Sequence, residues 1–210
     1  MKLVDRSVDD FCTVLASCEP APGGGSSAAL EGALGAALVG MSASLTIGRK
    51  KYAKHEELMI AAEGRAGELR LNFLDIIDRD AEAFNLVSAV FTMPKETNAE
   101  IAERSAAMQA ALKACTMTPL EVMECALATL ELMSEMLGKY NYNTASDFGV
   151  AALSLKAAVQ GAWLNVLINL GGIEDMQFSS ERRMQGEAAM DRALALADMI
   201  YADALRGIGK

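Results

Sequence analysis

The segment Leu69–Phe91, LRLNFLDIIDRDAEAFNLVSAVF, decides the fold class of this chain. Large apolar side chains return along it every three or four residues, which is the spacing of one side of an α-helix. The apolar row consists of Leu69, Phe73, Ile76, Ile77, Phe84, Val87 and Phe91. Asp80 falls within this row, whereas Asp78 is turned about 200° away, toward polar residues. The segment therefore predicts a long packed helix that carries one carboxylate on its packing side.

The rest of the chain is also helical in character. Its 210 residues are 52% hydrophobic, only 5% aromatic and include four prolines. Straight-chain residues and alanine lose little freedom in a helix, so this composition favours helix over sheet. We expect an all-α fold, a single domain over residues 1–210, built as an antiparallel up-and-down bundle of about seven helices. The predicted helices cover about residues 7–19, 26–47, 56–91, 98–117, 119–137, 145–170 and 174–206.

The single histidine, His55, excludes several chemistries by count. Zinc sites built on histidine pairs cannot form, and a Ser-His-Asp triad would need His55 itself. His55 follows a run of lysines, where a solvated surface is expected. We predict no metal site, and we expect acid–base work to fall to carboxylates, lysines or tyrosines.

The formal net charge of −9 disfavours nucleic acid and anionic membranes as partners. The segment 26–47 carries one charge, Glu31, over a length that could cross a bilayer, but its alanines, glycines and serines favour a helix buried in a soluble bundle. The four cysteines show no paired spacing, and the charged start of the sequence leads us to expect no signal peptide. We expect reduced core thiols and a cytoplasmic protein without a membrane partner.

Asp80 is the first candidate site residue. Desolvation would raise the pKa of its carboxyl group toward the range of a general acid or base. A buried aspartate held by a cap or an ion pair explains the same pattern equally well.

A second polar set lies along the predicted helix 145–170. Asp147, Asn165 and Asn169 stand among apolar residues, and the two amides share one face at a spacing of four. Buried amides must be hydrogen-bonded, so they indicate either an internal network or a polar ligand. The loop before this helix brings Asn143 and Ser146 to a helix start, where backbone donors would meet an anion or a carbonyl.

Two further motifs are candidate contacts for a ligand. Gly23, Gly24, Gly25 and Ser26 precede a helix, so their amides could hold a phosphate, a carboxylate or a planar heterocycle, although the motif is not a P-loop. The run 49–51 is a basic cluster in an acidic chain. A solvated face is the favoured interpretation of this cluster, and a binding site for a polyanionic small molecule is the alternative.

Several motifs together resemble the cyclodeaminase/cyclohydrolase family of folate enzymes. They are APGGGS (21–26), LTIGRKKY (45–52), DRDAEAF (78–84), MPK (93–95), SD (146–147) and NVLINL (165–170), in this order. The resemblance implies an all-helical homodimer or higher oligomer without a cofactor beyond the tetrahydrofolate substrate. It also implies that Asp80 is the catalytic aspartate. One departure is Tyr140, since the family usually has glycine directly before Asn141.

The resemblance implies three alternative functions, in the following order of preference. A formiminotetrahydrofolate cyclodeaminase, which forms 5,10-methenyltetrahydrofolate and ammonia, comes first. A 5,10-methenyltetrahydrofolate cyclohydrolase comes second, and a non-catalytic folate-binding or helical interaction module comes third. We expect the polar residues to orient the pterin and the basic run to attract the glutamate tail, including a polyglutamylated one. The expected substrate-binding residues are Gly23, Gly24, Gly25, Ser26, Arg49, Lys50, Lys51, Asn143, Ser146, Asp147, Asn165 and Asn169.

Overall fold

The computed structural model describes residues 2–208. Within that range the chain forms helices and no strand, which confirms the all-α prediction. The α-helices are α1 (Val8–Leu15), α2 (Gly24–Ser44), α3 (Glu56–Phe91), α4 (Asn98–Met136), α5 (Ala145–Leu170) and α6 (Met176–Gly207). Three short 3-10 helices are η1 (Leu3–Asp5), η2 (Lys50–His55) and η3 (Tyr142–Thr144).

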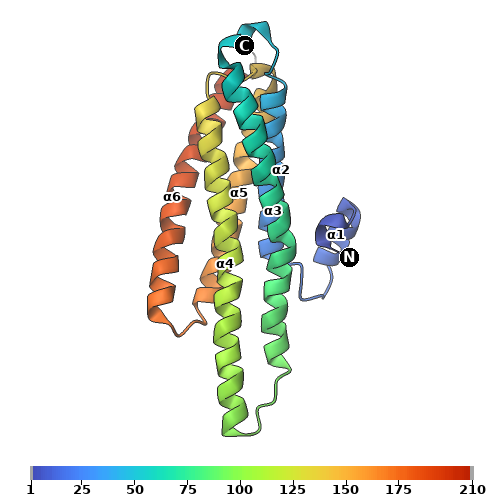
Figure 1. The fold of residues 1–210 in the computed structure, drawn as a ribbon, viewed down its shortest axis with the longest axis vertical. Helices are drawn as coiled ribbons and strands as arrows, with labels where there is room; N and C mark the ends of the chain where they lie inside the picture. Colours follow the sequence, from blue (N-terminus) through green and yellow to red (C-terminus); the bar gives the residue numbers. More distant parts are fainter. Residues whose placement is uncertain (1, 209–210) are drawn as a thin grey trace.

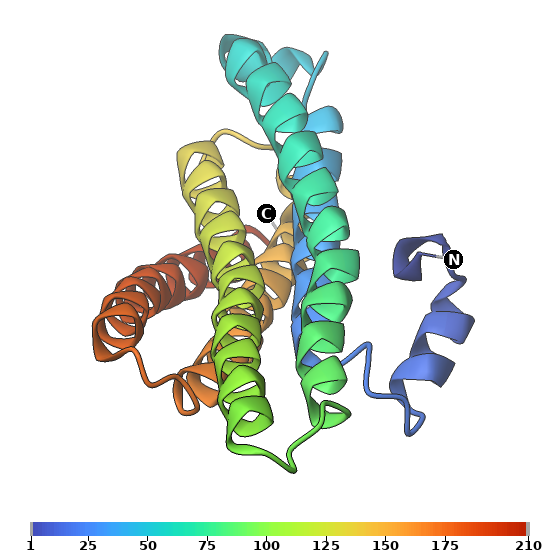
Figure 2. The same ribbon diagram turned by 60° about the horizontal axis from the view of Figure 1, so that its bottom comes forward.

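Four long helices, α2 to α5, lie side by side and form the body of the bundle (Figure 1). Helix α2 packs against α3 and α5, α4 packs against α3 and α5, and α6 adds to the side of α4 and α5. The α3–α4 pair extends beyond its neighbours at one end, and α1 lies beside the bundle (Figures 1 and 2). This arrangement leaves one side of α2 and α5 without a covering helix.

Helix α2 packs closely against α3 and α5 because its small side chains let these helices approach. A Cβ atom on Gly32 would lie 2.3 Å from the ring of Phe73 on α3, and one on Gly35 would lie 2.7 Å from Leu155 on α5. Both contacts are closer than real Cβ atoms allow. The glycines therefore fix how tightly α3 and α5 pack on α2, as dense interiors require.

Helix α4 is one continuous helix, although the sequence predicts two helices that meet near Pro119. Proline lacks the N–H group that would donate to the carbonyl oxygen four residues earlier, that of Cys115. In the structure this oxygen accepts a hydrogen bond of 2.8 Å from Asn169 Nδ2 on α5. A side chain from another helix thus replaces the missing bond, and residues 2–208 contain six α-helices, α1 included.

The apolar row on α3 is buried only in part. Phe73, Ile76 and Ile77 are fully buried, whereas Phe84 and Phe91 are 40% and 64% exposed. The prediction of a continuous packing face is wrong for these two, because α3 continues past the ends of α2 and α5 (Figure 1). Asp80 stands at this boundary and is half-buried.

The polar side of α3 and the cysteines differ from expectation in detail. Asp78 binds the N-terminal segment, because its Oδ1 accepts a 2.6 Å hydrogen bond from the backbone N–H of Leu3. The cysteines differ from expectation in their burial. All four are free. Cys115 is buried, but Cys12 and Cys18 are exposed, so the prediction of core thiols is wrong for these two.

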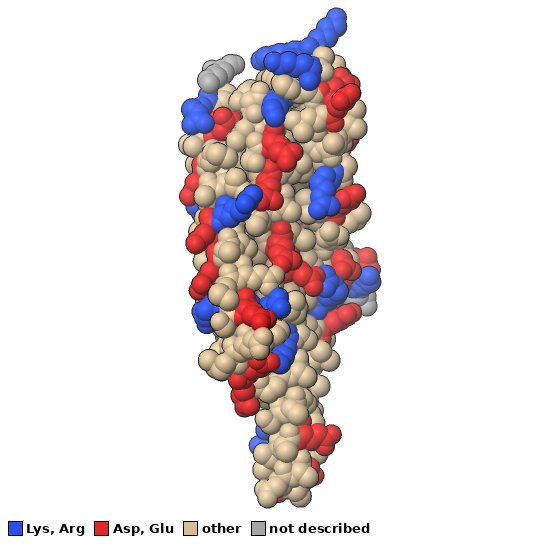
Figure 3. Space-filling view, turned by 60° about the vertical axis from the view of Figure 1, so that its left-hand side comes forward, with Lys and Arg blue, Asp and Glu red and all other residues tan. Residues whose placement is uncertain are grey.

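Charges are distributed unevenly over the surface. Figure 3 shows acidic and basic side chains interspersed along the face that contains α6, with basic side chains gathered at the end of the molecule near η2.

Within the described residues, one segment, Tyr142–Leu170, is long and apolar enough to cross a membrane by length and composition. Its most apolar window is 44% buried in the bundle. The predicted candidate for this property, residues 26–47, does not meet the same criteria.

Candidate functional site

Asp80 lines a pocket of about 210 Å³ where four helices meet. The first turn of α2, the middle of α3 and α4, and the last turns of α5 contribute its walls. The lining residues include Gly23, Gly24, Gly25, Asp80, Phe84, Cys115, Asn165, Ile168 and Asn169. The structure therefore brings together the glycine motif, the aspartate and both amides that the sequence singles out separately.

Two hydroxyl groups hold the Asp80 carboxylate. Ser26 Oγ lies 3.0 Å from Asp80 Oδ2, and Thr118 Oγ1 donates to Asp80 Oδ1 at 3.2 Å. Ser26 comes from the first turn of α2, and Thr118 stands directly before Pro119 in α4. The sequence does not single out Thr118, because the proline after it is typical of a helix start.

Ser26 can form a hydrogen bond with Asp80 whether the carboxyl group is ionised or protonated. Its hydroxyl lies 3.0 Å from Asp80 Oδ2 and 3.1 Å from the backbone carbonyl oxygen of Ile77. A hydroxyl donates one proton and accepts others. Ser26 can donate to an ionised Asp80, or donate to Ile77 while it accepts from a protonated Asp80. The aspartate can thus gain and lose a proton without leaving a buried polar group unsatisfied.

The pKa of Asp80 is raised above its ordinary value. Desolvation by burial is the largest cause, and the hydrogen bonds from Ser26 and Thr118 oppose it by favouring the ionised form. A carboxyl group with a raised pKa is suited to acid–base catalysis near neutral pH. Burial, together with the nearby Asp80 charge, raises the pKa of the Cys115 thiol to about 11, so this thiol stays protonated.

Gly25 is a glycine because Asp80 occupies the space of a side chain. A Cβ atom on Gly25 would lie 2.3 Å from Asp80 Oδ1 and 2.6 Å from Oδ2. A Cβ atom on Gly24 would lie 3.2 Å from Nδ2 of the Asn165 amide, which is also a tight contact. The glycine motif therefore allows the start of α2 to lie directly on the polar groups of α3 and α5.

Asn165 and Asn169 lie at the pocket on consecutive turns of α5. Asn165 Nδ2 donates to the Gly161 carbonyl oxygen at 2.8 Å, and Asn169 Nδ2 donates to the Cys115 carbonyl oxygen at 2.8 Å. Among the described residues, neither amide oxygen accepts a hydrogen bond. Each side chain is thus held in place by one bond and keeps an acceptor for a ligand.

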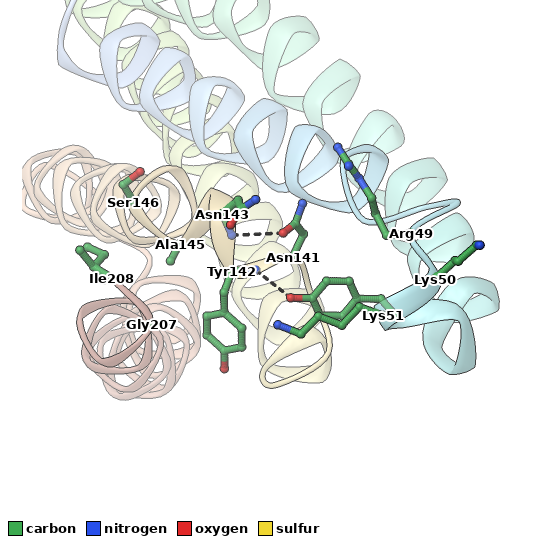
Figure 4. Close-up of a pocket in the computed structure, with 11 residues that line it drawn as sticks. Arg49, Lys50, Lys51, Asn141, Tyr142, Asn143, Ala145, Ser146, Gly207 and Ile208 are labelled. Atoms are coloured by element: carbon green, nitrogen blue, oxygen red, sulfur yellow. Dashed lines mark hydrogen bonds between the residues drawn. The ribbon is translucent and has the colours of Figure 1, made fainter. Parts of the chain in front are cut away.

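A second, larger pocket of about 760 Å³ lies at the other end of α2 and α5 (Figure 4). It is lined by the basic run together with the loop before α5: Arg49, Lys50, Lys51, Tyr52, Asn141, Tyr142, Asn143 and Ser146 are among its residues. Lys51 points toward Tyr142, whereas Arg49 and Lys50 extend away from Tyr142 in Figure 4. We call Arg49, Lys50 and Lys51 the basic cluster.

The loop at this second pocket is tied firmly to the end of α2. The backbone N–H of Asn141 donates to Thr46 Oγ1 at 2.8 Å, and Asn141 Nδ2 donates to the Leu45 carbonyl oxygen at 3.0 Å. The backbone N–H of Asn143 donates to Asn141 Oδ1 at 3.2 Å. The pocket therefore has a fixed polar wall beside its basic residues.

Tyr140, the departure from the family pattern, fills the core behind this loop. Its ring is fully buried and stacks on Phe148, with 4.2 Å between ring centroids. Gly138 supplies the left-handed conformation, φ 73°, that ends α4. The glycine two positions earlier thus makes the turn, and the tyrosine at 140 packs inward.

The two pockets are far apart within one chain. Helix α2 has 21 residues and spans about 30 Å at about 1.5 Å per residue. Asp147 is 18 positions before Asn165 on α5, or about 27 Å along the helix. Asn143, Ser146, Asp147 and the basic cluster therefore do not reach Asp80 in the same chain, whereas Gly23 to Ser26, Asn165 and Asn169 do.

The geometry defines a class of protein: an all-helical bundle with an acid–base type of pocket, in which a half-buried carboxylate faces amide groups. The family model described as formiminotransferase-cyclodeaminase matches residues 7–188. A protein from Methylorubrum extorquens named methenyltetrahydrofolate cyclohydrolase is 39% identical over 94% of this chain and 95% of its own length. The chain belongs to the formiminotransferase-cyclodeaminase family.

Two further relatives cover most of this chain. The rat formimidoyltransferase-cyclodeaminase is 31% identical over 94% of the chain, which spans only 37% of that longer protein. The crystal structure of formiminotetrahydrofolate cyclodeaminase from Thermotoga maritima superimposes with a TM-score of 0.79 at 28% identity, covering 97% of this chain and 96% of that one. The resemblance that the motifs predict is thus confirmed along nearly the whole sequence.

Proposed function

We propose that this chain hydrolyses 5,10-methenyltetrahydrofolate to 10-formyltetrahydrofolate. The observation that carries the proposal is the Asp80 carboxylate, half-buried and held by two hydroxyl groups beside Asn165 and Asn169. The similarity to a protein named methenyltetrahydrofolate cyclohydrolase, at 39% identity over nearly both full lengths, supports water as the second reactant. The hydrolysis, which the motifs predict as the second alternative, thus comes before the cyclodeamination.

Asp80 has the position and the raised pKa for both proton transfers of the reaction. As a base it takes a proton from the water that attacks the methenyl carbon, and a carbon–oxygen bond forms. As an acid it then returns a proton to N5 when the bond between N5 and this carbon breaks. The formyl group stays on N10, and one proton is released overall. General acid–base catalysis of this kind contributes about 100-fold to 10,000-fold in rate.

The other polar groups of the pocket have supporting roles in this proposal. Ser26 and Thr118 hold the carboxylate in place during both transfers. The amide oxygens of Asn165 and Asn169 accept hydrogen bonds from the N–H groups of the pterin ring. The reaction needs no cofactor beyond the folate substrate, and we propose a cytoplasmic enzyme that acts as a homodimer or higher oligomer.

Cyclodeamination of 5-formiminotetrahydrofolate is the second candidate. There N10 attacks the formimino carbon, Asp80 takes the N10 proton, and the departing amine leaves as ammonia after protonation. The 0.79 TM-score to a structure titled formiminotetrahydrofolate cyclodeaminase favours this reaction. Both reactions need a single carboxylate beside the one-carbon unit that links N5 and N10. The residues around Asp80 are therefore compatible with either reaction.

One purified sample assayed for both reactions tests the proposal. We expect the absorbance of 5,10-methenyltetrahydrofolate to fall much faster with enzyme than without it, and no ammonia release from 5-formiminotetrahydrofolate. Ammonia release without accelerated hydrolysis would instead establish the deaminase. Activity in neither assay would favour the third alternative, a non-catalytic folate-binding or helical interaction module.

A further inference from the structure

Pro119 breaks a local rule of helix structure inside α4. Proline is the least favourable residue in a helix interior, because it lacks an N–H group and its ring crowds the carbonyl group four residues earlier. Pro119 is nevertheless buried within one continuous helix that runs on to Met136. Exceptions of this kind are expected at functional sites, where they serve an arrangement that a regular helix cannot provide.

The carbonyl oxygen that Pro119 leaves without a backbone donor lies beside the Asp80 pocket. Cys115, which carries this oxygen, and Asn169, which binds it, both line the pocket. Asn169 Nδ2 donates to it at 2.8 Å across the contact between α4 and α5. The proline thus creates an acceptor for a side chain of another helix at the wall of the site.

Asn165, one turn earlier on α5, shows the alternative arrangement of the same side chain. Its Nδ2 donates to the carbonyl oxygen of Gly161, four residues back in its own helix, at 2.8 Å. The equivalent acceptor for Asn169 is the carbonyl oxygen of Asn165. Asn169 instead reaches across to α4, where Cys115 offers an oxygen without a backbone donor. This choice directs the whole carboxamide, because one carbon atom carries both its donor nitrogen and its acceptor oxygen.

The turn before Pro119 also differs from the rest of α4 in its hydroxyl groups. Thr116 and Thr129 donate to carbonyl oxygens four residues back in α4, at 2.8 and 2.7 Å. Thr118 instead donates across to Asp80 at 3.2 Å. Where α4 lines the pocket, it therefore forms two polar contacts with neighbouring helices, one with α3 and one with α5.

We infer that Pro119 is a positioning residue for Asn169, and that through Asn169 it determines how tightly the folate heterocycle binds. With Nδ2 held on the Cys115 carbonyl oxygen, Asn169 keeps its Oδ1 free of hydrogen bonds among the described residues, at the pocket wall. This oxygen accepts from an N–H group of the heterocycle, so the proline contributes to affinity without contact with the ligand. The identity of the ligand rests on the proposed function. The orientation of Asn169 rests on the hydrogen bonds alone.

A crystal structure of the Pro119→Ala variant tests the orientation without any activity. Alanine restores a backbone N–H group that donates to the Cys115 carbonyl oxygen. We expect Asn169 to turn back to the carbonyl oxygen of Asn165, as Asn165 turns to that of Gly161. An Asn169 side chain that stays on the Cys115 oxygen in this variant would overturn the inference.

Steady-state kinetics test the consequence for the substrate. We expect Pro119→Ala and Asn169→Ala each to raise KM for 5,10-methenyltetrahydrofolate about fivefold, with kcat changed less than about twofold. A contact made equally by bound substrate and transition state acts on KM in this way. The pH dependence of kcat, which Asp80 sets, should stay that of wild type. A shifted pH profile in Pro119→Ala would show that the proline acts through Thr118 on Asp80, and would overturn the inference.

Double variants show whether the proline acts through this one amide. In a chain that already carries Asn169→Ala, Pro119→Ala should raise KM by less than about twofold, because the group that it positions is absent. Asn165→Ala is the matched control, since that amide bonds to its own helix. In the Asn165→Ala background, Pro119→Ala should raise KM by the same factor as in wild type. An equal factor in the Asn169→Ala background would overturn the inference.

The outcomes separate this inference from the proposed function. A turned Asn169 in the Pro119→Ala structure, with no hydrolysis by wild type, would retain the positioning and reject the proposed reaction. Accelerated hydrolysis with an unchanged KM in Pro119→Ala would retain the reaction and overturn the inference. Gly64→Ala, at an exposed helix position with nothing within 4 Å, controls for added helix propensity and should leave KM unchanged. An equal rise in KM there would attribute the effect to helix stability and overturn the inference.

Discussion

The two ends of the α2–α5 pair are built on different physical principles. The Asp80 end is small, half-buried and lined by neutral groups, with a single carboxylate held by hydroxyls. The basic end is larger and open, and its cations are exposed. Burial raises the pKa of a carboxyl group. Exposed cations instead attract an anion from a distance through their charge. The first end is suited to chemistry and the second to capture of a charged tail.

Among substitutions at the two ends, replacement of Asp80 should have the largest effect on catalysis. We expect Asp80→Asn to lower kcat by about 100-fold to 10,000-fold, because one group performs both proton transfers. Methenyl absorbance measures the rate, and circular dichroism checks the fold. Asp78→Asn, on another face of α3, is the matched control and should stay near the wild-type rate. An Asp80→Asn enzyme of wild-type rate would remove Asp80 from the chemistry.

Gly25→Ala tests whether the start of α2 positions the carboxylate. The new methyl group would overlap Asp80 Oδ1, so the carboxylate must move away from Ser26. A displacement of about 1 Å can cost about 100-fold in rate, and we expect a loss of this order in kcat. Gly64→Ala, where nothing lies within 4 Å, should leave the rate unchanged. Equal effects of both changes would attribute the loss to helix stability.

Changes in the basic cluster should act on affinity and leave kcat nearly constant. We expect Arg49→Ala or Lys50→Ala to raise KM about fivefold for polyglutamylated substrate and less for monoglutamate. The difference should shrink at high salt, because these cations are exposed. Arg183→Ala, an exposed cation on α6, is the control. An equal effect on monoglutamate would contradict a role in tail binding.

The smallest expected effect is on stability, and its sign follows from the raised pKa of Asp80. The folded state binds the Asp80 proton more tightly than the unfolded state, so this group favours folding at low pH and that contribution is lost as pH rises through the folded-state pKa. Above the folded-state pKa the ionised, partly desolvated carboxylate is a cost to the fold. Asp80→Asn should therefore have a higher Tm than wild type above that pKa, and the advantage should shrink below about pH 4, where the carboxyl group is protonated in both states. Thermal unfolding at several pH values measures this difference, and an advantage that grows at low pH would contradict it.

The sequence predicts most of the elements and the centre of the site. The segment Leu69–Phe91 identifies both a long helix and Asp80, because a carboxylate within an apolar row needs a reason. The predicted helix 145–170 coincides with α5, and its two amides line the Asp80 pocket. Pro119 leads to the wrong prediction of two helices in place of α4. The hydrogen bond to the Cys115 carbonyl oxygen comes from Asn169, 50 positions after the proline. Thr118 is missed for the same reason.

The sequence by itself determined the fold class, the family and the residue types of both sites, because these follow from periodicity and from motifs a few residues long. It also contained the length of α2, and hence the distance between the glycine motif and the basic cluster. Only the tertiary structure decided which motifs share a pocket. Helix packing brings α2, α3, α4 and α5 together at Asp80 and holds Asp147 and the basic cluster at the other end, because a rigid helix of 21 residues cannot bring its own two ends together.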